Sequence, residues 1–173
     1  MDLLVLMAQQ RLGHRHEGRE GEKVSIQFLD LRTSQAISYG LPLNTGELVS
    51  NTSPGTQVGG VGLIVKDVLA GNKNDIRVEL DASVGMSSTM GDIVTLRVHR
   101  ISNGVTTVVF QGNQVIAGSA NVITGFTAAD FQPTFPTNGQ LVYRLFVQAQ
   151  SATDVFLDGP ISFNGLAVAG TFP

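Results

Sequence analysis

The chain of 173 residues contains no cysteine and has few charged residues. Without cysteine it can form no disulfide and no thiolate metal site, and it has no cysteine nucleophile. Only 14% of the residues are charged, whereas a soluble domain usually carries about 25%. This shortage favours a folded chain whose surface largely meets other protein, with a dry or protected surface as the alternative.

The sequence also lacks long apolar runs and a strong net charge. No stretch approaches the roughly 20 apolar residues that a membrane span requires, so we expect no membrane span. The net charge is −3, and this balance favours no nucleic-acid partner. The first residues do not resemble a signal peptide, because Asp2 stands where a basic region is expected and the apolar run after it is short.

Short alternating segments separated by turn residues make up most of the chain, which contains 20 glycines. In the clearest segment, residues 76–86, apolar side chains alternate with polar and charged ones, which is typical of a strand with one face in a core. Asn103-Gly104 predicts a hairpin turn. No segment has a helical period of useful length. We therefore expect an all-β fold, a jelly-roll β-sandwich of roughly eight to ten antiparallel strands with an N-terminal extension.

Composition divides the chain into three regions. Residues 1–23 combine an apolar start with a charge-dense stretch, and we interpret them as an N-terminal arm that connects subunits. Residues 24–55 predict a hairpin, with its turn at residues 32–35, followed by a polar loop. This second region either forms a separate module or belongs to the main domain. Residues 56–173 are expected to form the jelly-roll domain.

The strands expected at residues 140–150 and 161–169 organise the rest of the chain. The second strand is apolar on both faces toward its end, and a strand of this kind needs cover on both sides. We therefore predict a subunit interface that includes Leu166 and Val168, together with Tyr143 from the first strand. The apolar residues of the arm are expected to complete this interface by contacting the neighbouring subunit: Leu3, Leu4, Val5 and Leu6.

A metal site has one weak candidate, formed by His14, His16 and Glu17. Two histidines at positions i and i+2 can share one face of a strand and bind a metal ion, and the glutamate could join them. Glycines flank this segment, which favours a solvated tether instead. We therefore predict no metal site and no cofactor.

Acidic residues on the strands suggest ordinary pairing more strongly than catalysis. Glu79 and Asp81 point to one side of the same expected strand, where they can pair with Arg77 or with Arg97 on a neighbouring strand. No serine stands in a G-x-S-x-G context, and no phosphate-binding loop is present. The sequence therefore predicts no catalytic residues.

Four motifs carry a resemblance to a known family: IRVELDASVG, DIVTLRVHRISNG, TVVFQG and the closing DGPISFNGLAVAG, in which GPI-x-F-x-G is the most specific piece. Through them, the run from Asp75 to Gly170 resembles the small jelly-roll domains of bacterial spore-surface proteins of the exosporium type. The resemblance implies a fold like that of C1q and tumour necrosis factor, and assembly into trimers or larger lattices. It does not include the N-terminal region.

Together, these observations predict a non-enzymatic structural subunit that assembles with itself into a spore-surface layer or fibre, with other surface-layer proteins as further partners. The assembly is either a closed homotrimer or an open filament. Two alternatives remain open. One is a viral or phage capsid, decoration or fibre protein located in a virion. The other is a C1q-like module that binds carbohydrate or a receptor.

Overall fold

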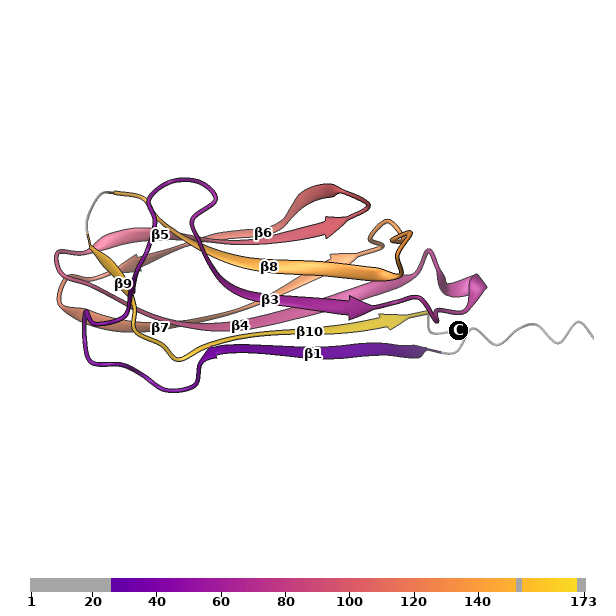
Figure 1. Ribbon diagram of the computed structural model, residues 1–173, viewed down its shortest axis with the longest axis horizontal. Helices are drawn as coiled ribbons and strands as arrows, with labels where there is room; N and C mark the ends of the chain where they lie inside the picture. Colours follow the sequence, from indigo (N-terminus) through magenta and orange to yellow (C-terminus); the bar gives the residue numbers. More distant parts are fainter. Residues whose placement is uncertain (1–25, 152–153, 171–173) are drawn as a thin grey trace, which may run out of the picture.

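Two antiparallel β-sheets lie face to face in the computed structural model, which describes residues 26–151 and 154–170 (Figure 1). Sheet A has the order β1-β10-β4-β7, and the short strands β9 and β2 extend it beside one end of β4. Sheet B has the order β3-β8-β5-β6. The strands are β1 (Gln27–Ile37), β2 (Glu47–Leu48), β3 (Thr56–Ile64), β4 (Ile76–Ser88), β5 (Asp92–Ser102), β6 (Val105–Ile116), β7 (Ala120–Phe131), β8 (Gln140–Ala149), β9 (Val155–Leu157) and β10 (Ile161–Ala169), with one 3-10 turn, η1 (Ala70–Asn72).

The chain passes repeatedly from one sheet to the other. Strands β3, β5, β6 and β8 belong to sheet B, and β4, β7 and β10, which alternate with them, belong to sheet A. This crossing pattern is that of a jelly roll, and the predicted fold class is confirmed. The predicted hairpin turn joins β5 to β6, with φ of 50° at Asn103 and 76° at Gly104, as a primed turn requires.

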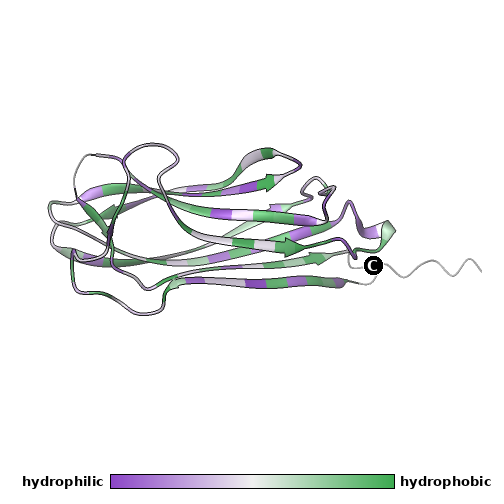
Figure 2. Ribbon diagram, in the orientation of Figure 1, coloured by the Kyte–Doolittle hydropathy of each residue, from purple (hydrophilic) through white to green (hydrophobic). Residues whose placement is uncertain are grey.

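The core lies between the two sheets and is built from alternate residues of each strand. Figure 2 shows hydrophobic and hydrophilic residues alternating along the strands. In β4, Val78 and Leu80 are buried while Glu79 is exposed, and in β8 the buried row includes Leu145 and Val147. The period of two in the sequence thus becomes one face in the core and one face outside.

The structure contradicts the hairpin that the sequence predicts around residues 32–35. Strand β1 continues through this stretch and pairs with β10. Its polar side chains bind the free edge of β3: Asp30 Oδ2 accepts a hydrogen bond from the amide of Ile64 at 2.9 Å, and Ser34 Oγ accepts one from the amide of Gly60 at 3.4 Å. Residues that suit a turn serve here to satisfy the N–H groups of an edge strand.

The described part of the second region belongs to the sandwich. Strands β1 and β2 pair with β10 and β9 of sheet A, so residues 26–55 are integrated into the main fold. Residues 1–23, the predicted arm, lie outside the described residues.

Candidate assembly surface

Two rows of side chains cross the outer face of sheet A. Each row takes one residue from each of β1, β10, β4 and β7, and successive residues in a row are direct cross-strand partners. Partners of this kind point to the same side of a sheet. We call these residues the apolar face: Phe28, Val168, Arg77 and Phe131 in the first row, and Leu31, Leu166, Glu79 and Ala129 in the second.

Large apolar side chains of this face are open to solvent in the single chain. Phe28 is 63% exposed, Leu31 is 57% exposed and Phe131 is 61% exposed. Between them, Leu166 and Val168 of β10 are half-buried. Monomeric soluble proteins seldom expose contiguous apolar patches, and such patches mark interaction sites. The second apolar row of β10 therefore lies on a surface of the single chain, and its role as a subunit interface stays a prediction.

A groove of about 380 Å³ lies in the apolar face between β10, β4 and β7. A dry cavity of about 150 Å³ is large enough to bind benzene, so this volume has room for about two large apolar side chains. We call it the outer groove. The residues that line it are Arg77, Val78, Glu79, Thr127, Ala128, Ala129, Leu166 and Val168.

Arg77 brings a positive charge to this groove. Its guanidinium carbon lies 5.4 Å from the centre of the Phe131 ring, which is a cation–π contact. The two ion pairs among the described residues involve other arginines. The Nε atom of Arg77 is buried and has no hydrogen-bond partner among these residues. Leaving a buried donor unsatisfied costs about 1–3 kcal/mol. A carboxylate from a partner would pair with the charge of the guanidinium.

The carboxylate of Asp158 holds the entry to β10 in place. Asp158 is fully buried and accepts hydrogen bonds from the amides of Asn44 at 2.9 Å, Thr45 at 3.2 Å and Gly46 at 2.8 Å, and from the Ser87 hydroxyl. Burial alone would raise the pKa of this carboxyl, but the hydrogen bonds lower it below its ordinary value. These hydrogen bonds join the loop before β2 and the end of β4 to the segment that leads into β10.

The closing motif that carries the family resemblance has a structural explanation. Gly159 has φ of 73°, and a Cβ atom there would lie 2.7 Å from the Ile37 side chain. A Cβ atom on Gly165 would lie 3.1 Å from the Val61 side chain of the opposite sheet. Phe163 is fully buried. These residues form and position β10, so the motif reports the fold more directly than a binding site.

The predicted interface residues fall into three groups. Leu166 and Val168 lie on the apolar face and line the outer groove. Tyr143 is fully buried, and its hydroxyl donates a hydrogen bond to Asp130 Oδ2 at 2.8 Å. The interface role predicted for Tyr143 is therefore wrong, because its row of β8 is the row that fills the core. The arm residues lie outside the described residues: Leu3, Leu4, Val5 and Leu6.

Sequence reasoning missed two members of the apolar face, Phe28 and Leu31. Strict alternation assigns them to opposite faces of a strand, because they are three positions apart. A register shift between Phe28 and Asp30 leaves Leu29 as an extra residue in β1. This bulge turns both Phe28 and Leu31 outward, toward Val168 and Leu166. No local signal in the sequence marks the bulge.

A buried polar cluster links the two sheets. Arg100 Nη1 donates hydrogen bonds to both carboxylate oxygens of Asp130, at 2.8 and 2.7 Å. Arg100 and Tyr143 belong to sheet B, whereas Asp130 belongs to sheet A. Burial and the neighbouring Asp130 carboxylate raise the pKa of Tyr143, so its hydroxyl remains a donor. The cluster is satisfied internally and acts as a structural cross-link.

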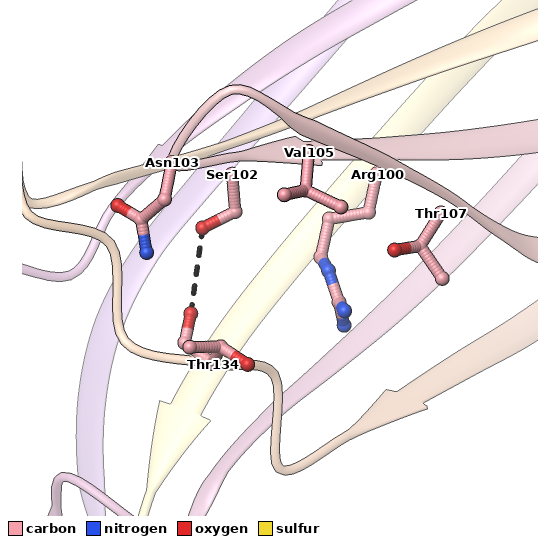
Figure 3. A pocket seen from close by; sticks show the side chains of 6 residues that line it. All are labelled: Arg100, Ser102, Asn103, Val105, Thr107 and Thr134. Carbon is pink, nitrogen blue, oxygen red and sulfur yellow. Dashed lines mark hydrogen bonds between the residues drawn. The ribbon is translucent and has the colours of Figure 1, made fainter.

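A polar pocket of about 170 Å³ lies between the β5–β6 hairpin and the loop after β7 (Figure 3). In Figure 3, Arg100 and Thr107 point the same way from neighbouring strands, and Ser102 Oγ donates a hydrogen bond to the carbonyl of Thr134 at 3.4 Å. The charge of Arg100 is balanced by Asp130. The pocket therefore offers hydroxyl and guanidinium groups without a net charge.

One acidic residue of β4, Asp81, has a partner that the sequence did not predict. Asp81 Oδ1 accepts a hydrogen bond from Asn164 Nδ2 at 2.8 Å. Arg97 lies in sheet B, where its Nε donates to Gln111 Oε1 at 2.9 Å, so it does not pair with the acids of β4. The alternating pattern showed which side these residues face, but it did not show which strands are neighbours.

Within the described residues, no group of three or more histidine and acidic side chains is placed to hold a metal ion. The weak candidates lie outside these residues, so their assignment stays a prediction: His14, His16 and Glu17. In the same part of the chain, none of the helices has the length and apolar character needed to cross a membrane.

No family model and no curated protein matches the chain. Among solved structures, it is similar to Eiger TNF from S. frugiperda, with 14% identity, a TM-score of 0.40, and coverage of 84% of this chain and 93% of the other. It is also similar to murine APRIL, with 14% identity, a TM-score of 0.38, and coverage of 86% and 100%. A structure of infectious bursal disease virus, Gx strain, has 9% identity and a TM-score of 0.42, covering 81% of this chain and 32% of the other. This chain thus spans about a third of that viral chain. The jelly-roll assignment rests on the strand order itself.

Proposed function

We propose that this chain is a non-enzymatic structural subunit that assembles with itself through the apolar face of sheet A. The observation that carries the proposal is the exposure of Phe28, Leu31 and Phe131 around the outer groove. An assembly that covers this face removes large apolar side chains from water and gives β10 cover on both sides.

The energies indicate how much of the face must be covered. Fully burying a Leu or Phe side chain stabilises by about 1.5–3 kcal/mol, so burying the exposed part of three such side chains contributes about 3–5 kcal/mol. Association costs about 4–15 kcal/mol. Three side chains are therefore insufficient, and the contact must extend over both rows and the groove.

The proposed setting is a spore-surface layer or fibre in which the N-terminal arm contacts the neighbouring subunit. The resemblance of the closing motif to exosporium-type domains supports this setting. A virion shell is the alternative, since the apolar face suits either assembly. Immunogold labelling of intact spores and of virions from the source organism distinguishes the two settings, and label on neither excludes both.

The test of self-assembly compares the full-length chain with two matched variants by mass photometry and negative-stain electron microscopy. Leu31→Asp places a charge on the apolar face, and Val115→Asp places the same charge on β6 of sheet B, where Val115 is 65% exposed. We expect the unchanged chain and Val115→Asp to form oligomers or fibres, and Leu31→Asp to remain monomeric with unchanged circular dichroism.

Two outcomes contradict the proposal. A full-length chain that stays monomeric at high micromolar concentration shows that the apolar face does not drive assembly. Assembly that is lost equally in both variants shows that the contact surface is not specific to sheet A.

A module that binds carbohydrate or a receptor is the second candidate. The observation that favours it is the neutral polar pocket beside Arg100, whose hydroxyl and guanidinium groups suit the hydroxyls of a sugar (Figure 3). A glycan array tests it with the full-length chain and with Thr107→Val as the matched variant. Saturable binding that is weaker in the Thr107→Val variant supports this candidate. An array without signal excludes carbohydrate binding.

A further inference from the structure

We propose that residues 2–6 of one copy fill the outer groove of a neighbouring copy, with the carboxylate of Asp2 against the guanidinium of Arg77. This inference rests on the proposed self-assembly. It names the segment that fills the groove and the charge pair that orients it.

The groove sets the chemistry of its occupant. Its walls include the apolar side chains of Leu166 and Val168, and its volume has room for about two large side chains. At its rim, Arg77 carries a charge without an ion pair among the described residues, and the exposed Glu79 adds a negative charge to the same lining. A fitting segment therefore combines consecutive apolar residues with one carboxylate beside them.

The chain contains one acidic residue that four apolar residues follow directly, at residues 2–6, Asp-Leu-Leu-Val-Leu. Runs of three apolar residues follow Asp67 and Asp154. Those runs are already used by the fold, because Val68 is 6% exposed and Val155 is fully buried. Residues 2–6 are thus the segment of this chain with the required chemistry that the sandwich does not itself employ.

The position of the arm suits this role. The described chain begins two residues before Phe28, which pairs with Val168 at the rim of the groove. About 20 residues separate residue 6 from this point, and an extended chain of that length spans up to about 65 Å. The described chain therefore begins beside the groove, and the length of the arm allows residues 2–6 to reach the groove of a neighbouring copy.

Exchange between copies gives the arm a part in assembly that docking within one copy does not. Closing a loop of about 20 residues costs little entropy, whereas association is costly. An arm that enters a neighbour's groove buries its apolar residues in the same step that joins the copies, so this burial helps to offset the cost of association.

The absence of cysteine allows a direct test by disulfide trapping in the full-length chain. One variant combines Leu4→Cys with Leu166→Cys, and the matched control combines Leu4→Cys with Val115→Cys on sheet B. After mild oxidation, we expect the groove pair to give covalent dimers and larger species on a non-reducing gel, at least about tenfold more than the control pair, with both thiols identified by mass spectrometry of the linked peptides.

The other outcomes each overturn a stated part. A disulfide within single chains overturns exchange between copies. Equal cross-linking of both pairs, or none, overturns binding in the groove. Cross-linking that fails while electron microscopy still shows assemblies rejects this inference and leaves the proposed function standing. A wild-type chain that never assembles rejects the proposed function itself.

A charge exchange tests the pairing of Asp2 with Arg77 in the trapping background. We expect Asp2→Lys and Arg77→Glu each to reduce groove cross-linking about tenfold, the effect of about 1.4 kcal/mol at a desolvated charge pair. The double variant should recover cross-linking to within about twofold of the starting level, because the pair is restored with reversed signs. A double variant that is no better than either single variant rejects the charge pair.

Discussion

The two outer faces of the sandwich follow the same alternation of residues, but only one of them is complete in the single chain. On sheet B, polar side chains bind one another: Arg97 donates to Gln111 at 2.9 Å and to Gln148, and Gln150 donates to Thr95 Oγ1 at 3.0 Å. On sheet A, the corresponding rows carry large exposed apolar side chains and the unpartnered Nε of Arg77.

The two faces differ in how much apolar side-chain surface a contact would remove from water. Sheet B also exposes Val105, Val108 and Val115 on β6 and Ile93 on β5, the cross-strand partner of Val115. These residues lie on two neighbouring strands at one edge of the sheet, and exposed apolar residues of this kind are ordinary. The apolar residues of sheet A lie in two rows across β1, β10 and β7, which Arg77 and Glu79 interrupt at β4, and they border a groove. A hydrogen-bonded face gains little from contact, whereas contact that removes exposed apolar side chains from water is favourable.

The largest effect is expected from weakening the attachment of β10, the strand that carries Leu166 and Val168 of the apolar face. Asp158→Asn should lower the free energy of unfolding by about 2–4 kcal/mol, because the amide loses acceptor capacity toward three backbone amides and the Ser87 hydroxyl. The control is Asp154→Asn, since Asp154 is exposed. Urea titration of both variants measures the effect. Equal free energies of unfolding would show that the hydrogen bonds of Asp158 do not stabilise the fold.

Lowering the pH should weaken the same hydrogen bonds, because it protonates the Asp158 carboxylate. Burial opposes ionisation of Asp158, but its hydrogen bonds lower the folded pKa below the ordinary 3.8. The stabilisation is therefore fully present above pH 3.8 and is lost as the pH falls through the lowered value. The stability difference between the unchanged chain and Asp158→Asn should shrink over that range, and a difference independent of pH would contradict this assignment.

The next largest effect on stability is expected at Tyr143, which the structure places in the core and not on the apolar face. Tyr143→Phe should cost about 1–2 kcal/mol of stability, because the hydroxyl bound to Asp130 is lost inside the core. Assembly of the folded chain should not change. Tyr39→Phe serves as the control, since Tyr39 is 69% exposed. If Tyr143→Phe altered the oligomer mass while leaving the melting temperature unchanged, its assignment to the core would be mistaken.

One substitution on each outer face tests whether sheet A and sheet B have different roles in stability and assembly. Arg97→Ala should cost about 1 kcal/mol of stability, since it breaks the hydrogen bonds of sheet B, and it should leave assembly intact. Leu31→Asp should change stability by no more than about 0.5 kcal/mol and abolish assembly, because Leu31 is exposed. Thermal unfolding together with sedimentation velocity gives both readouts, and the opposite pattern would reverse the roles of the faces.

The smallest effect is a dependence on pH at His99 on sheet B, whose ring centre lies 4.8 Å from that of Phe146. Partial burial, and then the charge of Arg97, lower its pKa below the ordinary 6.5. The neutral form is therefore favoured in the folded state, and stability falls as the pH drops below 6.5 through the lowered value. His99→Gln should flatten that slope in urea titrations between pH 8 and pH 5, and an unchanged slope would assign it to other groups.

The sequence predicted only some of the residues of the apolar face. Leu166 and Val168 could be found because β10 is apolar in both rows, and that signal is local. Phe28 and Leu31 could not, because a bulge in β1 decides which way they point. Tyr143 was misassigned because an alternating strand does not reveal which neighbours cover each row.

The sequence by itself determined that this chain forms strands, where most of them turn, and that β10 needs cover on both faces. Period-two alternation, the Asn-Gly turn and the lack of helical pattern are local properties, and they are enough for the fold class. Only the tertiary structure decided that Phe28 lies beside Val168, and that Arg77 faces a groove with its Nε unsatisfied. Such placements depend on register between strands far apart in the chain, and that register is set by the packing of both sheets together.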